Sequence, residues 1–461
     1  MTQAGRNVAS LGRPLVLAAV AALILTAAAI PGRADFREPQ QDQHCKDLSY
    51  PLVPESPDKL DKPAAAEIYQ YDLDPLANRI PLMMLHGGGG ESRPLFRLDR
   101  IAQWLNQDQE FQKKYKIYFL RYNASSVLDE SVPHIEEALR EFGRRVRRPF
   151  CAIGYSLGGN ALQRALLNPD VDSVVDLVIA LGTPFRGSPL FCSDWYEYSL
   201  HRNHHYPWSR LLKTHSRRLY FNRHPHFLSD LRWDNADGHV PEVGNFRSLV
   251  PFGPRGNLTI EGTSNERLAA INNEGELTKH KFITYAGYLP SPLMMPTPIR
   301  QLILFVRTPI DLLGTKFPLI FGDEHAALRI LNHDISRVLV HPGGLSGSAK
   351  TMPYLLNDGL APVTSCILFA PEAFRAYPAP RASDLPRLGP WLDVRLARVF
   401  RNIDHVSFAD GRPPHLGSFR VKDEMHPDEH PRPLLDWLLL DLLDFANRQG
   451  PDQRIHSTTI R

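Results

Sequence analysis

A serine between two glycines is the position in this sequence best suited to covalent chemistry. The pentapeptide at 154–158 reads Gly-Tyr-Ser-Leu-Gly, follows the apolar run 149–153 and precedes a helical pattern over 159–167. That order predicts a strand, a sharp turn and a helix, and such a turn lifts the Ser156 hydroxyl clear of the backbone. The glycines matter because larger side chains would collide across so tight a turn. We therefore predict that Ser156 is a nucleophile.

A serine hydroxyl is a weak nucleophile at neutral pH, so it needs a base, an acid that orients the base, and donors for the oxyanion. A run of four glycines, 87–90, follows His86 and the apolar stretch 80–85. Such a run lets backbone N–H groups face a developing negative charge with no side chain in the way. We expect an oxyanion hole made of the N–H groups of Gly88 and Leu157. His86 precedes the serine and belongs to this loop, so we expect its role to be structural.

The acid and the base should follow the serine along the chain, with the histidine last. Asp358 lies in an Asn-Asp-Gly turn ahead of the apolar run 363–369, and His405 follows the apolar run 394–400. A histidine just past a late strand can reach a serine at the same edge of a sheet. We predict Asp358 as the acid and His405 as the base. Asn-Asp-Gly is also a common turn sequence, and the alternatives are Asp384 or Asp404 as the acid and His426 as the base.

The elements that must position these residues alternate between strands and helices. Apolar runs predict strands at 80–85, 115–120, 150–153 and 174–181, with helices predicted at 98–105, 132–146 and 159–167. After a long break, the pattern returns with predicted strands at 363–369 and 394–400 and a last helix at 434–447. This alternation predicts an α/β fold with a mostly parallel sheet, helices on both faces, and a site at the carboxyl ends of the strands.

The break in the pattern separates a core from a large insertion. Residues 191–260 are dense in His, Arg, Trp and Tyr, and residues 288–353 are rich in proline and glycine. The apolar stretch 302–306 either forms a lid over an acyl pocket or packs the insertion against the core. The His and Arg cluster within 201–226 either meets an anionic head group or is a solvated face. We predict a signal peptide at 1–34, an extended N-terminal arm at 35–77, a core at 78–190 and 354–450, a cap or lid insertion at 191–353, and a tail at 451–461.

The N-terminus has the pattern of an export signal. Arg6 and Arg13 precede an apolar run over 15–30, and a small-residue cleavage pattern ends at Ala34. We predict cleavage there and export to the periplasm or the extracellular space. The alternative is an uncleaved membrane anchor, for which the run is slightly short. Loss of residues 1–34, with three arginines and no acid, lowers the formal net charge from +3 to 0, so net charge does not indicate nucleic-acid binding.

Four cysteines permit disulfides in an exported protein. Cys151 and Cys366 lie in apolar runs typical of core residues, whereas Cys45 and Cys192 have polar or aromatic neighbours and form the more plausible pair. No C-x-x-C or zinc-binding spacing occurs in the sequence.

Four motifs together resemble the α/β-hydrolase superfamily, in its secreted bacterial lipase and esterase branch, the triacylglycerol-lipase-like proteins. They are His-Gly-Gly at 86–88, Gly-Tyr-Ser-Leu-Gly-Gly at 154–159, Leu-Gly-Thr-Pro-Phe-Arg-Gly-Ser at 181–188, and Asn-Asp-Gly at 357–359 with Asp-His at 404–405. The resemblance covers roughly 78–190 and 354–448. It implies a secreted serine hydrolase that cleaves carboxylic esters, with Ser156 as nucleophile, Asp358 as acid and His405 as base. The implied substrate is a small-molecule or lipid ester, with transient contact at a membrane or lipid interface.

One position departs from the resemblance. Lipases of this type often carry an aspartate two residues after the catalytic histidine, as part of a structural calcium site, and this chain has Ser407 there. We therefore assign no metal ligands, leave the calcium site open, and predict no cofactor. Two other functions stay open: acyl transfer or polyester depolymerisation on the same core, and a non-catalytic envelope protein of this fold.

Overall fold

The structure is a computed structural model of the 461-residue chain. It describes residues 50–53, 61–92, 94–191, 227–233, 240–243, 258–259, 265–274, 279–291, 338–341, 351–410 and 419–449, and the single positions 325, 328, 329, 331, 332, 335 and 336. The predicted signal peptide, Cys45, Cys192, the apolar stretch 302–306, the His and Arg cluster within 201–226 and the tail lie outside the described residues.

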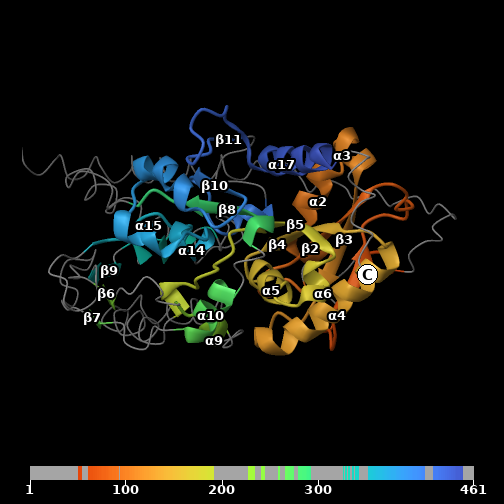
Figure 1. The fold of residues 1–461 in the computed structure, drawn as a ribbon, viewed down its shortest axis with the longest axis horizontal. Helices are drawn as coiled ribbons and strands as arrows, with labels where there is room; N and C mark the ends of the chain where they lie inside the picture. Colours follow the sequence, from red (N-terminus) through yellow and green to blue (C-terminus); the bar gives the residue numbers. More distant parts are fainter. Residues whose placement is uncertain are drawn as a thin grey trace, which may run out of the picture.

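A seven-stranded sheet forms the centre of the molecule (Figure 1). Its order is β1 (Glu67–Gln70), β3 (Tyr115–Arg121), β2 (Ile80–Leu85), β4 (Phe150–Tyr155), β5 (Val175–Leu181), β8 (Phe282–Tyr288) and β10 (Leu396–Arg401). Only β1 runs antiparallel to its neighbour, and every other pair in this sheet is parallel. A parallel sheet covered on both faces needs apolar side chains on both faces, which is why the inner strands are nearly continuous apolar runs.

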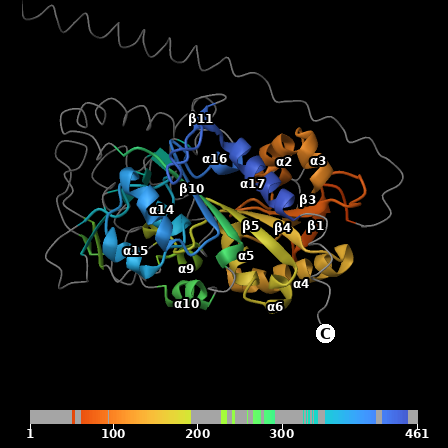
Figure 2. The same ribbon diagram turned by 45° about the horizontal axis from the view of Figure 1, so that its top comes forward.

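Helices cover both faces of this sheet, as the two views of Figure 1 and Figure 2 show. One face carries α4 (Leu128–Val146), α5 (Leu157–Ala165) and α6 (Pro169–Asp172), and the other carries α2 (Asp99–Leu105), α3 (Gln109–Lys114) and α17 (Leu434–Arg448). Successive residues of a strand point to opposite faces, so Met83 belongs to the core under α4 and α5 while Met84 belongs to the core under α2 and α17. The predicted fold class, a mostly parallel sheet with helices on both faces, is confirmed.

The long helices form because their apolar residues recur every three or four positions. In α4, Ile135, Leu139 and Phe142 are fully buried against the sheet, while charged residues such as Glu137 and Arg144 face outward and pair with each other. This spacing places one continuous apolar stripe on the side of the helix that meets the strands. The predicted helices at 98–105, 132–146 and 434–447 all correspond to helices of the structure.

The remaining described elements are short. They are η3 (Pro94–Arg97), η4 (Pro189–Phe191), α9 (Phe227–Asp230), α10 (Glu266–Glu274), η8 (Lys279–Lys281), α14 (Val363–Cys366), α15 (Pro371–Ala376), η11 (Ala382–Trp391) and α16 (Ser407–Asp410). Two small sheets add β7 (Leu258–Thr259), β6 (Val240–Val243) and β9 (Val338–His341), and β11 (Arg420–Val421) with β12 (Arg432–Pro433). Within the described part of the chain, no helix is both long and apolar enough to span a membrane.

The structure corrects the sequence analysis at two strands. Residues 282–288 fall in the range predicted as an insertion, yet they form β8, which lies between β5 and β10 in the main sheet. The strand predicted at 363–369 is wrong, because 363–366 form the short helix α14. The strand that lies between β5 and β10 is therefore β8 and not the segment at 363–369. In addition, the predicted N-terminal arm contributes β1 to the edge of the sheet.

Candidate active site

The strand-to-helix turn at Ser156 has the geometry that its sequence predicts. β4 ends at Tyr155 and α5 begins at Leu157, so Ser156 alone makes the turn, with φ 52° and ψ −122°. Few non-glycine residues adopt a positive φ, and those that do are held there by the surrounding structure. A side-chain carbon at Gly154 would lie 2.6 Å from the Gly159 Cα. The two glycines therefore let strand and helix approach closely enough to force the turn.

The structure brings Ser156, His405 and Asp358 into one chain of hydrogen bonds. The Ser156 Oγ lies 2.8 Å from the His405 Nε2, and the His405 Nδ1 lies 2.8 Å from the Asp358 Oδ2. Asp358 is fully buried, and the other two residues are 5% and 7% exposed. A neutral imidazole that donates from Nδ1 to a carboxylate presents the free Nε2 lone pair to the hydroxyl. This arrangement lets His405 accept the serine proton.

The turn at 357–359 holds the Asp358 carboxylate in place. Its Oδ1 accepts hydrogen bonds from the backbone N–H groups of Leu360 and Ala361, at 2.8 and 2.7 Å, which leaves Oδ2 for His405. The Asp358 carbonyl also accepts the backbone N–H of His405 at 3.1 Å. Four polar contacts thus tie the acid to its own turn and to the base, and charge-assisted bonds of this kind are the stronger ones in proteins.

The alternative acids and the alternative base bond elsewhere. The Asp404 side chain bonds Ser407 and His325, and the Asp384 side chain accepts the backbone N–H of Arg381 at the start of η11. His426 bonds the buried carboxylate of Asp423, at 2.8 Å from its Nδ1. Sequence reasoning left these alternatives open, and the structure brings none of the three to Ser156.

The glycine loop lies against the serine, as an oxyanion loop must. A side-chain carbon at Gly87 would lie 3.0 Å from the Ser156 Cβ, so glycine allows this approach without displacing the serine. The N–H of Gly90 donates to the carbonyl of Gly87, which closes a turn with Gly88 at its second position. Leu157 is the first residue of α5, and the first N–H groups of a helix have no partner inside it. Leu157 follows Ser156 in the chain, and Gly88 follows Gly87, whose backbone lies close to Ser156, and their role as oxyanion donors stays a prediction.

His86 is buried at the base of this loop. Its Nδ1 lies 2.8 Å from the Gly87 carbonyl and its Nε2 lies 3.3 Å from the Tyr122 backbone nitrogen, so Nδ1 donates and Nε2 accepts. Its ring stacks on Tyr122 with centroids 4.5 Å apart. Burial lowers the pKa of His86, which favours the neutral form that these two bonds require. These contacts agree with the structural role expected for this histidine.

The Gly-Thr-Pro turn after β5 packs against both the base and the nucleophile helix. Gly182 has φ +55°, and a side-chain carbon there would lie 2.9 Å from the Phe408 ring and 3.4 Å from the His405 Nδ1. A side-chain carbon at Gly159 would collide with the Thr183 side chain. The turn therefore leaves room for the imidazole on one side and holds α5 on the other.

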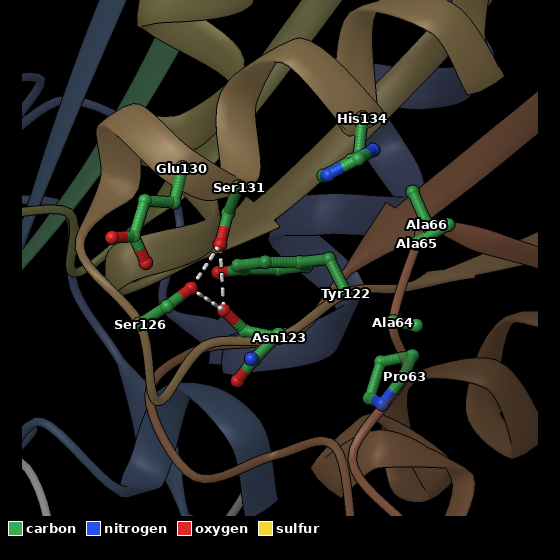
Figure 3. Close-up of a pocket in the computed structure, with 10 residues that line it drawn as sticks. All are labelled: Pro63, Ala64, Ala65, Ala66, Tyr122, Asn123, Ser126, Glu130, Ser131 and His134. Atoms are coloured by element: carbon green, nitrogen blue, oxygen red, sulfur yellow. Dashed lines mark hydrogen bonds between the residues drawn. The ribbon is translucent and has the colours of Figure 1, made fainter.

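A cavity of about 180 Å³ lies beside the start of α4 (Figure 3). It is lined by Pro63, Ala64, Ala65, Ala66, Tyr122, Asn123, Ser126, Glu130, Ser131 and His134. The hydroxyls of Ser126 and Ser131 lie 2.8 Å apart, and both bond the Asn123 carbonyl. Tyr122, which lines the cavity, also donates its hydroxyl to the His86 carbonyl at the start of the glycine loop. None of Ser156, Asp358 and His405 lines the cavity.

Ser407, the position that departs from the resemblance, has a partner of its own. Both its backbone N–H and its hydroxyl donate to the Asp404 Oδ1, at 2.9 and 2.7 Å. Among the described residues, no group of three or more His, Cys, Asp or Glu side chains has the arrangement of a metal site. Cys151 and Cys366 are buried free thiols, and burial raises the pKa of each.

The sheet order, the serine turn after its central strand, and an acid and a histidine on later loops together identify the architecture. The chain has the α/β-hydrolase fold. No protein-family model matches it, and no curated protein matches it in sequence. Solved structures with this α/β-hydrolase architecture do match, at low similarity.

Three of these solved structures illustrate the range. Bacillus licheniformis lipase BlEst2 in its mature form is 13% identical, with 83% of this chain and 99% of that chain covered and a TM-score of 0.39. Phospholipase PlaB from Legionella pneumophila is 12% identical, with 47% and 41% covered and a TM-score of 0.29. Est1E from Butyrivibrio proteoclasticus is 13% identical, with 50% and 76% covered and a TM-score of 0.25.

Proposed function

We propose that this protein is a serine hydrolase that cleaves carboxylic esters through an acyl-enzyme. The observation that carries the proposal is the unbroken chain of hydrogen bonds from Ser156 through His405 to Asp358, with both heavy-atom distances at 2.8 Å. Serine, imidazole and carboxylate in this order supply a nucleophile, a base and an orienting acid.

In the first half of the reaction, His405 takes the proton of Ser156 through Nε2 while the serine Oγ attacks the ester carbonyl carbon. The C=O π electrons move onto the oxygen, which becomes an oxyanion held by the N–H groups of Gly88 and Leu157. The C=O bond then re-forms, the bond between the acyl carbon and the alcohol oxygen breaks, and that oxygen takes the proton of His405 as the alcohol leaves, so the acyl group stays on Ser156. Asp358 steadies the positive imidazolium from 2.8 Å throughout.

In the second half, water replaces the alcohol. His405 accepts a proton from the water, whose oxygen attacks the acyl carbon, and the same N–H groups hold the second oxyanion. Collapse of this intermediate breaks the bond to the Ser156 Oγ, which recovers its proton from His405. The products are the free acid and the alcohol, and the enzyme returns to its starting state.

Lipid-like esters are the first substrates to examine, because the Gly-Thr-Pro turn at 182–184 carries the resemblance to triacylglycerol-lipase-like proteins. Among the structures reported above, one is named a lipase and one a phospholipase. We further propose export to the periplasm or the extracellular space, on the pattern of residues 1–34. Mass spectrometry of the N-terminus of the protein recovered from its host tests export, and a mature chain that starts near residue 35 supports it.

The decisive experiment compares the purified protein with Ser156→Ala on p-nitrophenyl esters from short to long acyl chains. Ser173→Ala is the matched control, because Ser173 is an exposed serine at the end of α6. We expect hydrolysis by the protein and the control, loss of about 10⁴-fold or more in Ser156→Ala, and release of free acid without an acceptor alcohol. Full activity in Ser156→Ala refutes the mechanism, and turnover that requires an acceptor alcohol shows acyl transfer instead.

A further inference from the structure

Residues from the range predicted as an insertion contact the two loops that carry the acid and the base. The described positions between 325 and 336 include the buried residues Leu328, Asn332, Ile335 and Ser336. The hydrogen bonds from this segment to the two loops span 21 to 79 positions of the chain, so local sequence does not reveal the contacts. Each contact is made by a polar side chain or by a carbonyl that meets a buried turn.

On the acid side, Asn332 and Asn357 bond each other in both directions. The Asn332 amide nitrogen lies 3.0 Å from both the carbonyl and the side-chain oxygen of Asn357. The Asn357 amide nitrogen in turn lies 3.3 Å from the Asn332 carbonyl and 3.1 Å from the Ser336 hydroxyl. Asn357 immediately precedes Asp358, so these bonds fix the start of the acid turn.

Gly359, the residue after Asp358 in that turn, is also enclosed. Gly359 has φ +93°, a conformation that favours glycine, and a side-chain carbon there would lie 2.4 Å from the Leu328 carbonyl oxygen. Leu328 is 1% exposed. The acid turn is therefore held on one side by Asn332 and covered on the other by Leu328.

On the base side, His325 bonds the carboxylate of Asp404, the residue before His405. The His325 Nδ1 lies 2.6 Å from the Asp404 Oδ2, while the Asp404 Oδ1 accepts two bonds from Ser407. Asp404 is fully buried, and a buried carboxylate is strongly destabilising when it loses a donor. Ser407 lies on the same loop as His405, so His325 is the described contact that ties this carboxylate to a distant part of the chain.

We propose that His325 is a positioning residue for His405, and that it acts by donating from Nδ1 to the Asp404 carboxylate. The proposal rests on the proposed function for its catalytic meaning, and on the His325–Asp404–Ser407 contacts for its structure. Its physical basis is that proton transfer depends on the distance between His405 and Ser156. A displacement of the base by about 1 Å costs on the order of 10²-fold in rate.

Two substitutions of His325 separate donation from packing. His325→Asn keeps a donor near the place of Nδ1 but loses the ring, whereas His325→Phe keeps a ring of similar size but loses the donor. His325→Ala is a second donor-free variant, for use if the phenyl ring prevents folding. The matched control is His430→Phe, because His430 is an exposed histidine outside the catalytic loops. Thermal unfolding of each variant identifies those that keep the native fold.

The readouts are the rate constant for labelling of Ser156 by a fluorophosphonate, kcat and KM for p-nitrophenyl butyrate, and the downfield proton NMR signal of the His405 Nδ1–H. We expect His325→Phe to lower the labelling rate and kcat by about 10- to 100-fold, with KM unchanged and the NMR signal broadened. We expect His325→Asn to retain most of the rate and His430→Phe to match the wild type.

Wild-type labelling and an intact signal in folded His325→Phe and His325→Ala overturn the proposal, and so does a larger loss in His325→Asn than in His325→Phe. The labelling rate and the NMR signal need no ester turnover. If the wild-type protein is labelled but hydrolyses no ester, the proposed function fails while the labelling series still decides the role of His325.

Discussion

Replacement of Asp358 by asparagine should reverse the tautomer of the catalytic histidine. The Asp358 Oδ1 accepts the N–H groups of Leu360 and Ala361, at 2.8 and 2.7 Å, so the one oxygen of an asparagine must take that position. The amide NH₂ then occupies the place of Oδ2, 2.8 Å from the His405 Nδ1, and donates to it. The histidine proton moves to Nε2, which faces Ser156 as a donor and cannot accept the serine proton.

The expected loss follows from that reversal. A triad whose histidine has the wrong tautomer loses about 10⁴-fold in rate, which corresponds to about 5 kcal/mol of transition-state stabilisation at about 1.4 kcal/mol for each tenfold change. Asparagine has nearly the size of aspartate and keeps both backbone donors satisfied. We therefore expect Asp358→Asn to fold normally and to lose activity through kcat rather than KM.

The assay is steady-state hydrolysis of p-nitrophenyl butyrate at one mildly alkaline pH, with thermal unfolding measured on the same samples. Asp384→Asn is the matched control, because Asp384 is an alternative acid in the sequence analysis and its side chain bonds the Arg381 N–H rather than a histidine. The control should keep wild-type kcat/KM. If folded Asp358→Asn retains more than about a tenth of the wild-type kcat/KM, the tautomer argument is wrong, since it requires a loss of about 10⁴-fold.

The remaining predictions concern other contacts. His426→Asn should leave hydrolysis unchanged. The hydrogen bond to Asp423 raises the pKa of His426, so this histidine stabilises the fold below the ordinary histidine pKa, and the stabilisation is lost as pH rises through the raised pKa. In urea unfolding, the variant should therefore lose more free energy of unfolding in acid than in alkali. Gly154→Ala should lower the free energy of unfolding by about 1–3 kcal/mol, because the added methyl group would collide with the backbone of α5. Gly389→Ala, where the added carbon would have nothing within 4 Å, should lower it little, and equal losses in the two variants would contradict this explanation. Arg398→Leu should lower the free energy of unfolding by about 3–5 kcal/mol, because the carboxylates of Asp423, Glu429 and Asp441 lose the cation that pairs with them. A loss below about 1 kcal/mol in chemical denaturation would show that other groups stabilise these carboxylates.

The parts of the fold that follow from local sequence were predicted closely. The strand at 80–85 is a continuous apolar run that ends at a glycine loop, and the last helix at 434–447 has apolar residues spaced every three or four positions, so local sequence predicts both. The strand β8 was missed, although its run Phe-Ile-Thr-Tyr-Ala-Gly-Tyr at 282–288 is rich in β-branched and aromatic residues. It stands between segments with no strand-helix alternation, so the surrounding composition outweighed the local pattern.

The same limit applies to the site. The serine turn at 154–158 encodes its own geometry, because the glycines and the strand-helix order lie within a few residues of each other. The prediction of Asp358 rests on its Asn-Asp-Gly turn and on its place between Ser156 and His405 in the chain, and these two features leave Asp384 and Asp404 open. His325 gives no signal in the sequence, because it lies 79 positions before the aspartate that it bonds.

The sequence by itself therefore determined a serine held at a strained turn, a glycine loop that precedes it, and the alternation that builds a parallel sheet. Tertiary structure alone decided which carboxylate meets His405, which strand fills the place beside β10, and which residues of the distant segment hold the acid and the base. The physical reason is the distance along the chain over which each kind of interaction is determined. Turn geometry and amphipathic periodicity are local properties of the chain, whereas a hydrogen bond between loops exists only after the sheet has brought the carboxyl ends of its strands together.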